Sequence, residues 1–343
     1  MLLSVIGGVI YTIASPPGRE KTDVVKIDED QKDELKSAHT DRLSAKWDSE
    51  DRIPSWPVAE TMALLSDYAY LPPLNAEQKF RELGFSKCVT ILQGSMVGYV
   101  VSNDDSTVIV FRGTDFVELS DWLSNVNTSP FDTPNGKIHS GFYDAYHAGE
   151  AERYFSMKHQ VDEVLAQNKP KHLWVCGHSL GGALALVCAY DLEENEGRQI
   201  DGMITFGQPL LVRQGLADYL DDKFVRRYAR FAVGEDLVTK IAPGHSYCGS
   251  LVHFIGDGKI KRSDPKLQVV AFSTGSNGGQ AKGGNEIEPM TDEDFKLLLR
   301  KMGKLPPEQG SLPYGQPLTT TAAAMIEDHS MERYLENIRE LFK

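Results

Sequence analysis

The sequence predicts an α/β fold with a mostly parallel central sheet and helices on both faces. Apolar runs rich in strand-forming residues recur between about residues 107 and 236, and stretches of helical length separate them. Strands that alternate with helices form parallel sheets, because each helix carries the chain back across the sheet. Chemically active side chains are therefore expected at the carboxyl ends of these strands.

The segment 173–183 is the strongest single pattern in the chain. Four apolar residues run into Gly-His-Ser-Leu-Gly at 177–181, and a helix is predicted from Ala183 to Tyr190. In this strand–turn–helix context the pattern is typical of a nucleophile elbow, whose glycines permit a turn tight enough to lift Ser179 off the sheet. The N–H of Leu180 then lies at a helix start, where it is free to bind an oxyanion.

The charge and cysteine content limit the kinds of molecule that the chain can bind. The 343 residues include 36 basic and 49 acidic side chains, a net charge of −13. This balance excludes nucleic acid as a partner and argues against an anionic membrane surface, while a neutral ester or a lipid droplet remains compatible. The four cysteines have no metal-ligand spacing, so neither a metal site nor a disulfide framework is expected.

The first 55 residues are predicted to stand apart from a larger unit of residues 56–343. Two interpretations of residues 1–15 stay open: a signal or anchor that lacks a basic start, and a β-hairpin that turns at Gly7-Gly8 and packs on the body. Residues 16–55 follow as a polar arm, partly helical from Asp28 to Leu43. The localisation therefore stays open between secreted or membrane-associated and cytoplasmic.

Several further elements bear on the site. Strands are predicted over 107–111, 203–206, 224–233 and 251–255, one long helix from His139 to about Asn168, and a terminal helix from Met331 to Phe342. The Gly- and Pro-rich stretch 273–325 is predicted to be an insert. A lid is expected either at 115–125, where large apolar residues stand among polar ones, or in that insert.

A serine nucleophile needs a base, and the base needs an orienting carboxylate that follows a strand end. Asp236 follows the strand that ends at Val233, and this position favours it over its neighbour Glu235, which would point the other way, and over the later Asp257. Arg112-Gly113-Thr114 also ends a strand. This turn either carries a second oxyanion donor or is a simple strand-end turn.

Three histidines follow Asp236 in the chain and are candidates for the base. His253 falls in the middle of a strand, and His245 lies only nine residues after Asp236 in a Pro-Gly turn. His329 lies in a loop just before a helix, where an imidazole can reach over the edge of the sheet. His329 is therefore the favoured base.

Six motifs together make the chain resemble the class 3 lipases, the α/β-hydrolase family that includes the fungal triacylglycerol lipases. They are Val110-Phe111-Arg112-Gly113-Thr114, Ile138-His139-Ser140-Gly141-Phe142, the elbow 177–183, Thr205-Phe206-Gly207-Gln208-Pro209, Glu235-Asp236-Leu237-Val238, and the segment 328–334. The resemblance runs from about Pro57 to the C-terminus. The chain departs from the family at Leu237, where a proline is usual, and in a longer interval between Asp236 and His329.

The resemblance implies an α/β-hydrolase fold and a catalytic triad of Ser179, Asp236 and His329. It places the oxyanion hole at the N–H groups of Thr114 and Leu180. The implied function is a serine carboxylic ester hydrolase that acts on acylglycerol lipids at a lipid–water interface through an acyl-enzyme, without cofactor or metal. Alternatives are a phospholipase A1, a short-chain esterase, an acyltransferase, and a lipase-like interaction protein without turnover. Acyl-chain preference and oligomeric state are left open.

Overall fold

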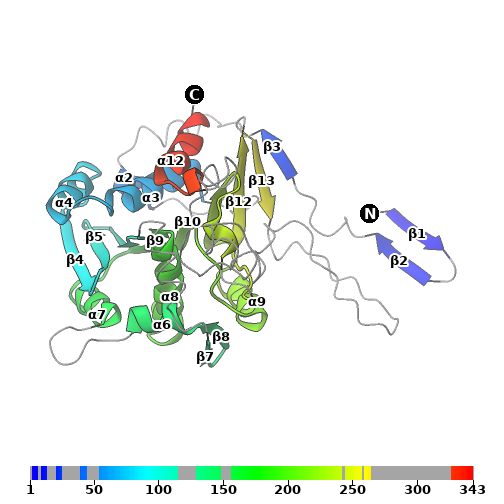
Figure 1. The fold of residues 1–343 in the computed structure, drawn as a ribbon, viewed down its shortest axis with the longest axis horizontal. Coiled ribbons are helices and arrows are strands. Elements are labelled where there is room, and N and C mark those ends of the chain that lie inside the picture. Colours follow the sequence, from blue (N-terminus) through cyan, green and yellow to red (C-terminus); the bar gives the residue numbers. More distant parts are fainter. Residues whose placement is uncertain are drawn as a thin grey trace, which may run out of the picture.

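A computed structural model describes residues 2–6, 9–13, 21–24, 39–44, 54–114, 129–147, 156–241, 244–256, 259–263 and 326–342. Both segments where a lid is expected, 115–125 and the insert 273–325, lie outside the described residues, and so does Asp257. The described part is built around one nine-stranded sheet, which Figure 1 shows with its helices.

The sheet has a parallel centre and antiparallel edges. Its order is β3 (Lys21–Val24), β13 (Lys259–Ser263), β12 (Ser250–Gly256), β11 (Tyr228–Val233), β10 (Gly202–Phe206), β9 (His172–His178), β6 (Ser106–Phe111), β5 (Met96–Ser102) and β4 (Lys87–Gln93). The five strands from β12 to β6 run parallel, and two strands pair antiparallel at each edge. The predicted mostly parallel sheet is confirmed for this centre.

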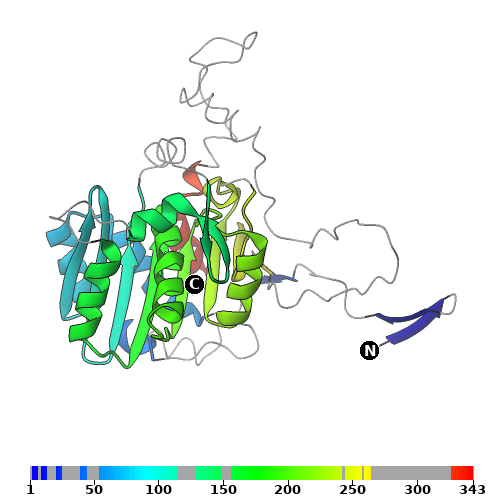
Figure 2. The same ribbon diagram turned by 90° about the horizontal axis from the view of Figure 1, so that it is seen from below.

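Helices cover both faces of the sheet, as predicted. One face carries α6 (Ser140–His147), α7 (Met157–Gln167), α8 (Leu180–Glu194) and α9 (Gln214–Lys223), and the other carries α3 (Trp56–Tyr68), α4 (Pro73–Glu82) and α12 (Met331–Glu340). Figure 2 shows the first group in front of the sheet. Because strand side chains alternate between faces, Val175 of β9 packs in one core and Cys176 in the other.

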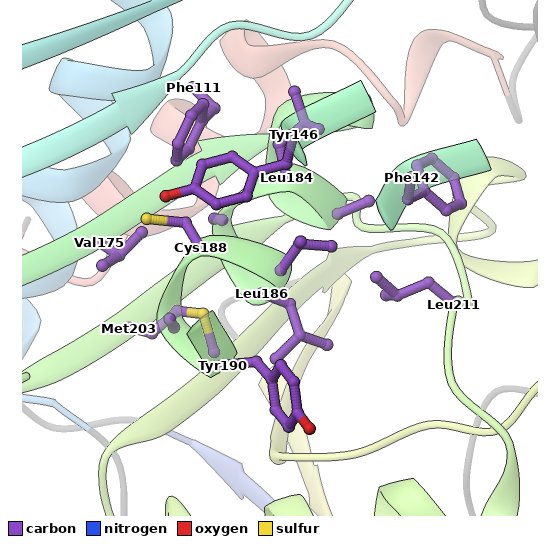
Figure 3. Close-up of a cluster of buried hydrophobic side chains, with 14 of the residues drawn as sticks. Phe111, Phe142, Tyr146, Val175, Leu184, Leu186, Cys188, Tyr190, Met203 and Leu211 are labelled. Atoms are coloured by element: carbon purple, nitrogen blue, oxygen red, sulfur yellow. The ribbon is translucent and has the colours of Figure 1, made fainter. Parts of the chain in front are cut away.

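Helix α8 is buried along its whole length, which fixes the start of the helix against the sheet. Figure 3 shows Leu184 and Cys188 of α8 gathered with Val175 of the sheet and with Phe142 and Tyr146 of α6. The helix has almost no polar face, since every residue from Leu180 to Glu193 except Asp191 and Glu193 is apolar, small or aromatic. A helix that is apolar on every side is a central one.

Two expectations about the elements were wrong, and two further elements were not predicted. The stretch 139–168 is not one helix: His139 ends strand β8 (Gly136–His139), which pairs with β7 (Pro130–Thr133), and α7 starts anew where the Ser156 hydroxyl accepts the N–H of His159. Strand β11 begins at Tyr228 and not at Phe224. Helix α4 was not expected; it begins at Pro73, since proline is well suited to a first helical position. Strand β13 was not expected at all.

Parts of the first 55 residues join the main sheet or its helices. The strands β1 (Leu2–Ile6) and β2 (Val9–Ile13) pair antiparallel with each other in a sheet of their own. Strand β3 pairs with β13 and so extends the nine-stranded sheet. The short helix α2 (His39–Arg42) packs on α3, and the carbonyl of Leu43 accepts the indole N–H of Trp174 at 3.0 Å.

The ion pair between Arg42 and Glu60 fastens this arm to α3. The Arg42 side chain is only 5% exposed and lies 3.0 Å from the Glu60 carboxylate. Arg42→Ala would leave a largely buried carboxylate without this partner, so we expect it to lower the free energy of unfolding by about 3 kcal/mol in urea. The matched control is Arg81→Ala, because Arg81 pairs with Glu77 at the surface, where such pairs contribute about 0.5 kcal/mol. Equal losses in the two variants would contradict a structural role for the arm.

Candidate active site

The turn at Ser179 has the geometry of a nucleophile elbow. Ser179 adopts φ 58° and ψ −129° between β9 and α8. A Cβ added at Gly177 would lie 2.3 Å from the carbonyl oxygen of Gly181, and one added at Gly181 would lie 2.1 Å from the carbonyl oxygen of Phe111. Side chains at either position are therefore excluded, which is the requirement read from the sequence.

The Ser179 hydroxyl lies at the helix start and is held away from solvent. Ser179 is fully buried, and its Oγ has no hydrogen-bond partner among the described residues. The neighbouring Leu180 is the first residue of α8, so its N–H has no acceptor within the helix. A buried hydroxyl without a hydrogen bond does not stabilise the fold. Beside a helix N–H that has no acceptor in the helix, it is placed to react with a bound group.

The loop after β6 brings Thr114 to the elbow. A Cβ at Gly113 would lie 2.9 Å from Cβ of Ser179 and 2.7 Å from the carbonyl oxygen of His178. The hydroxyl of Thr114 is buried and has no hydrogen-bond partner in the described part of the chain. The contact at Gly113 favours an oxyanion donor at Thr114 over a simple strand-end turn, because the turn lies directly against the nucleophile.

Asp236 and His329 meet although 93 residues separate them. The Nδ1–H of His329 donates to the Asp236 carboxylate, with distances of 2.9 Å to Oδ1 and 3.0 Å to Oδ2. Both side chains are buried. The His329 carbonyl accepts a hydrogen bond of 2.7 Å from Nε2 of His178, the residue next to Ser179, so His329 lies against the elbow. The structure thus joins Asp236 to His329 and sets the His329 loop against the elbow of Ser179 and Leu180, while Gly113, next to Thr114, also lies against Ser179.

The rival candidates lie elsewhere. The Glu235 carboxylate is exposed and pairs with Lys240. His245 is buried beside His139, with ring centroids 5.2 Å apart. Nε2 of His253 bonds the carbonyl of Gly234 at 2.7 Å, so this histidine contacts the backbone of the acid loop and not the carboxylate of Asp236.

Asp328 connects the loop that carries His329 to the loop that carries Asp236. Its Oδ2 accepts the backbone N–H of Glu235 at 2.9 Å. A Cβ at Gly234 would lie only 2.3 Å from the same oxygen, so the two loops are in direct contact. The acid and the base are therefore joined through their neighbours as well as through their own side chains.

Tyr334 belongs to the site, although the sequence patterns predict no function for it. Its hydroxyl donates to Oδ2 of Asp236 at 2.5 Å. Burial, and then the adjacent Asp236, raise the pKa of Tyr334 well above its ordinary value, so the hydroxyl stays protonated. Burial alone would raise the pKa of Asp236, but His329 and the hydrogen bonds from His329 and Tyr334 lower it below its ordinary value. Asp236 is therefore ionised at neutral pH.

The described residues contain no group of three or more His, Cys, Asp or Glu side chains placed to hold a metal ion. Within the same residues, no helix is both long enough and apolar enough to cross a bilayer.

Comparisons with known proteins agree with this geometry. The sequence model of the class 3 lipases matches residues 108–246. A lipase of Rhizomucor miehei is 32% identical over 150 residues, covering 41% of this chain and 39% of the relative. A chloroplastic phospholipase A(1) of Arabidopsis thaliana is 28% identical over 182 residues, covering 44% of this chain and 39% of the relative. The chain thus matches about two fifths of the length of these relatives.

Solved structures share the fold. Lipase II of Rhizopus niveus superimposes with a TM-score of 0.51 at 21% identity, covering 61% of this chain and 84% of that one. The α/β-hydrolase fold expected from the motifs is confirmed by this likeness and by the sheet described above.

Proposed function

We propose, starting from the match of residues 108–246 to the class 3 lipases, that the chain is a serine carboxylic ester hydrolase that acts on acylglycerols. One observation carries the proposal: the hydrogen-bonded pair of Asp236 and His329 lies against the elbow that presents Ser179. A serine that passes its proton to a histidine, which is in turn held by a buried carboxylate, is an arrangement that performs acyl transfer. No metal or organic cofactor takes part in this chemistry.

The first half of the reaction acylates Ser179. Its Oγ attacks the ester carbonyl carbon while its proton passes to Nε2 of His329, and Asp236 stabilises the imidazolium that results. Since Oγ makes no hydrogen bond to any described residue, it closes on His329 as substrate binds. The oxyanion of the tetrahedral intermediate is bound by the N–H groups of Thr114 and Leu180, which contribute about 3 kcal/mol each. The intermediate then expels the alcohol, which takes the proton from His329.

The second half releases the acid. His329 takes a proton from water, whose oxygen attacks the acyl carbon on Ser179, and the same two N–H groups bind the second oxyanion. Collapse of this intermediate breaks the bond to Oγ, which recovers its proton from His329. The fatty acid leaves and the enzyme returns to its starting state.

The runner-up is a phospholipase A1, which uses the same triad on a different head group. It is favoured by the Arabidopsis relative that carries this description. Side chains at the rim of the site select the acyl chain and the head group, and both candidate lid segments lie outside the described residues. The substrate is therefore proposed at the level of an acyl ester of glycerol, presented at a lipid–water interface.

Labelling by a fluorophosphonate tests the proposal at Ser179, because attack of Oγ on phosphorus displaces fluoride and leaves a stable adduct. We expect the wild type to be labelled and Ser179→Ala to be silent, with Ser140→Ala labelled like the wild type as a control for another buried serine. Hydrolysis of p-nitrophenyl esters from C2 to C16, then of a triacylglycerol emulsion and of phosphatidylcholine vesicles, separates esterase, lipase and phospholipase. Folded wild type that is neither labelled nor active would point to the interaction protein.

A further inference from the structure

His178, the residue before the nucleophile, makes a polar contact at each ring nitrogen. Its Nδ1 lies 2.6 Å from the Tyr70 hydroxyl, and its Nε2 lies 2.7 Å from the backbone carbonyl oxygen of His329. The ring itself lies beside the His329 imidazole, with centroids 4.5 Å apart and an interplanar angle of 31°. Neither His178 nor Tyr70 takes part in the proton transfers or the oxyanion binding of the proposed reaction.

The chemistry of the two contacts fixes the tautomer of His178. A carbonyl oxygen only accepts, so Nε2 must carry the hydrogen and donate it to His329. Nδ1 of the neutral ring is then an acceptor, and the Tyr70 hydroxyl donates to it. The hydrogen bonds therefore run in one direction, from Tyr70 through His178 to the main chain of His329.

The charge of His178 matters because its neighbour becomes a cation during the reaction. Burial, and then the nearby His329, lower the pKa of His178 to about 3, so the ring is neutral at pH 7. A second cation at this separation would oppose the imidazolium that forms on His329. A neutral donor holds the base without repelling it.

Tyr70 connects this chain of bonds to the oxyanion loop. It lies at the corner between α3 and α4, and its hydroxyl would be only 2.3 Å from a Cβ added at Gly113. The same added atom would meet Ser179 and the carbonyl of His178. The Tyr70 hydroxyl thus lies where the oxyanion loop, the elbow and, through His178, the histidine loop converge.

We propose that His178 and Tyr70 are positioning residues that hold His329 by its main chain at the correct place relative to Ser179. Asp236 fixes the imidazole from its Nδ1 side, and His178 fixes the backbone from which that imidazole projects. The base is then held at two points that come from different strands, β11 and β9. The inference rests on the proposed ester hydrolysis, since positioning has a meaning only if Ser179 and His329 react.

Two replacements of His178 separate its donor from its bulk. The amide nitrogen of glutamine reaches about as far as Nε2 of histidine, and that of asparagine only as far as Nδ1. We expect His178→Asn to lower kcat for p-nitrophenyl butyrate by about 10- to 100-fold with KM changed less than twofold, because a misplaced base slows the chemical step. His178→Gln should recover most of the rate, to within about fivefold of wild type.

Tyr70→Phe is the milder variant and removes one hydroxyl. We expect kcat to fall about three- to tenfold with KM unchanged. Urea unfolding of each variant shows whether it is folded at the assay temperature.

Equal kcat in wild type, His178→Asn and Tyr70→Phe would overturn the inference. Equal losses of kcat in the Asn and Gln variants would also overturn it, and so would a change in KM in place of kcat. A folded wild type without activity would overturn the proposed function instead, and a slow but labelled His178→Asn protein would leave that function standing.

Discussion

His329→Ala is expected to lower kcat for ester hydrolysis by about 10⁴-fold or more, while the protein still folds and binds ester. Without the imidazole, nothing takes the Ser179 proton as its oxygen attacks, and triad members removed singly cause losses of this size in serine hydrolases. The same variant should label with a fluorophosphonate far more slowly than the wild type, because labelling uses the same proton transfer. The measurement is kcat on the best p-nitrophenyl ester, with the labelling rate beside it.

His253→Ala is the matched control for this prediction. His253 also follows Asp236 in the chain, but its Nε2 bonds the backbone carbonyl of Gly234. Losing one such bond is expected to reduce kcat by about tenfold at most. If His253→Ala were as inactive as His329→Ala, the acid–base pair proposed here would be wrong, since the two variants differ in which histidine meets Asp236.

Gly207→Ala is expected to lower kcat by about 100-fold or more and to destabilise the fold by about 1–3 kcal/mol. Gly207 follows β10 with φ +56°, a conformation that costs free energy for any residue with a Cβ. That Cβ would lie 2.8 Å from Oδ2 of Asp236 and 2.8 Å from Nδ1 of His329. The methyl group would therefore force the acid and the base apart, and a displacement of about 1 Å suffices for a loss of this order.

Gly215→Ala serves as the control for Gly207→Ala. Gly215 lies in α9, and a Cβ there would meet no atom within 4 Å. Alanine in a helix is favoured over glycine by about 0.5–1 kcal/mol, so this variant should unfold at higher urea concentration and keep full activity. The prediction fails if Gly207→Ala retains wild-type kcat, because the contact with the acid–base pair would then be unimportant.

The elbow and the parallel centre of the sheet could be predicted because local physics determines both. A Cβ at Gly177 would lie 2.3 Å from the backbone of its own turn, and one at Gly181 would lie 2.1 Å from the end of the neighbouring strand β6. Only glycine fits at either position, so the glycine pattern predicts the turn directly. Asp236 follows a strand, and the parallel register of β9, β10 and β11 places all three strand ends on one edge. Such features depend on residues near one another in sequence or on a simple rule of sheet topology.

What could not be predicted depends on contacts between distant residues or on caps. The break between α6 and α7 depends on the Ser156 cap, which looks like an ordinary serine within an amphipathic stretch. Tyr334 could have been suspected, because it lies one turn into the helix that follows the base. Tyr70 gives no such signal: it meets His178 across 108 residues, and only the packing of α3 near the elbow brings them together. Strand β13 pairs antiparallel with both β12 and the edge strand β3, and the alternation of strands and helices does not predict it.

The backbone at Ser179 is strained, and replacing the serine with glycine would release that strain. Among the described residues only Ser179 and Arg226 combine a side chain with a positive φ. Such a conformation costs about 1–3 kcal/mol, and glycine at the elbow would remove that strain at once. Under the proposed ester hydrolysis, this free energy is the cost of holding the Ser179 hydroxyl where it can attack a bound ester.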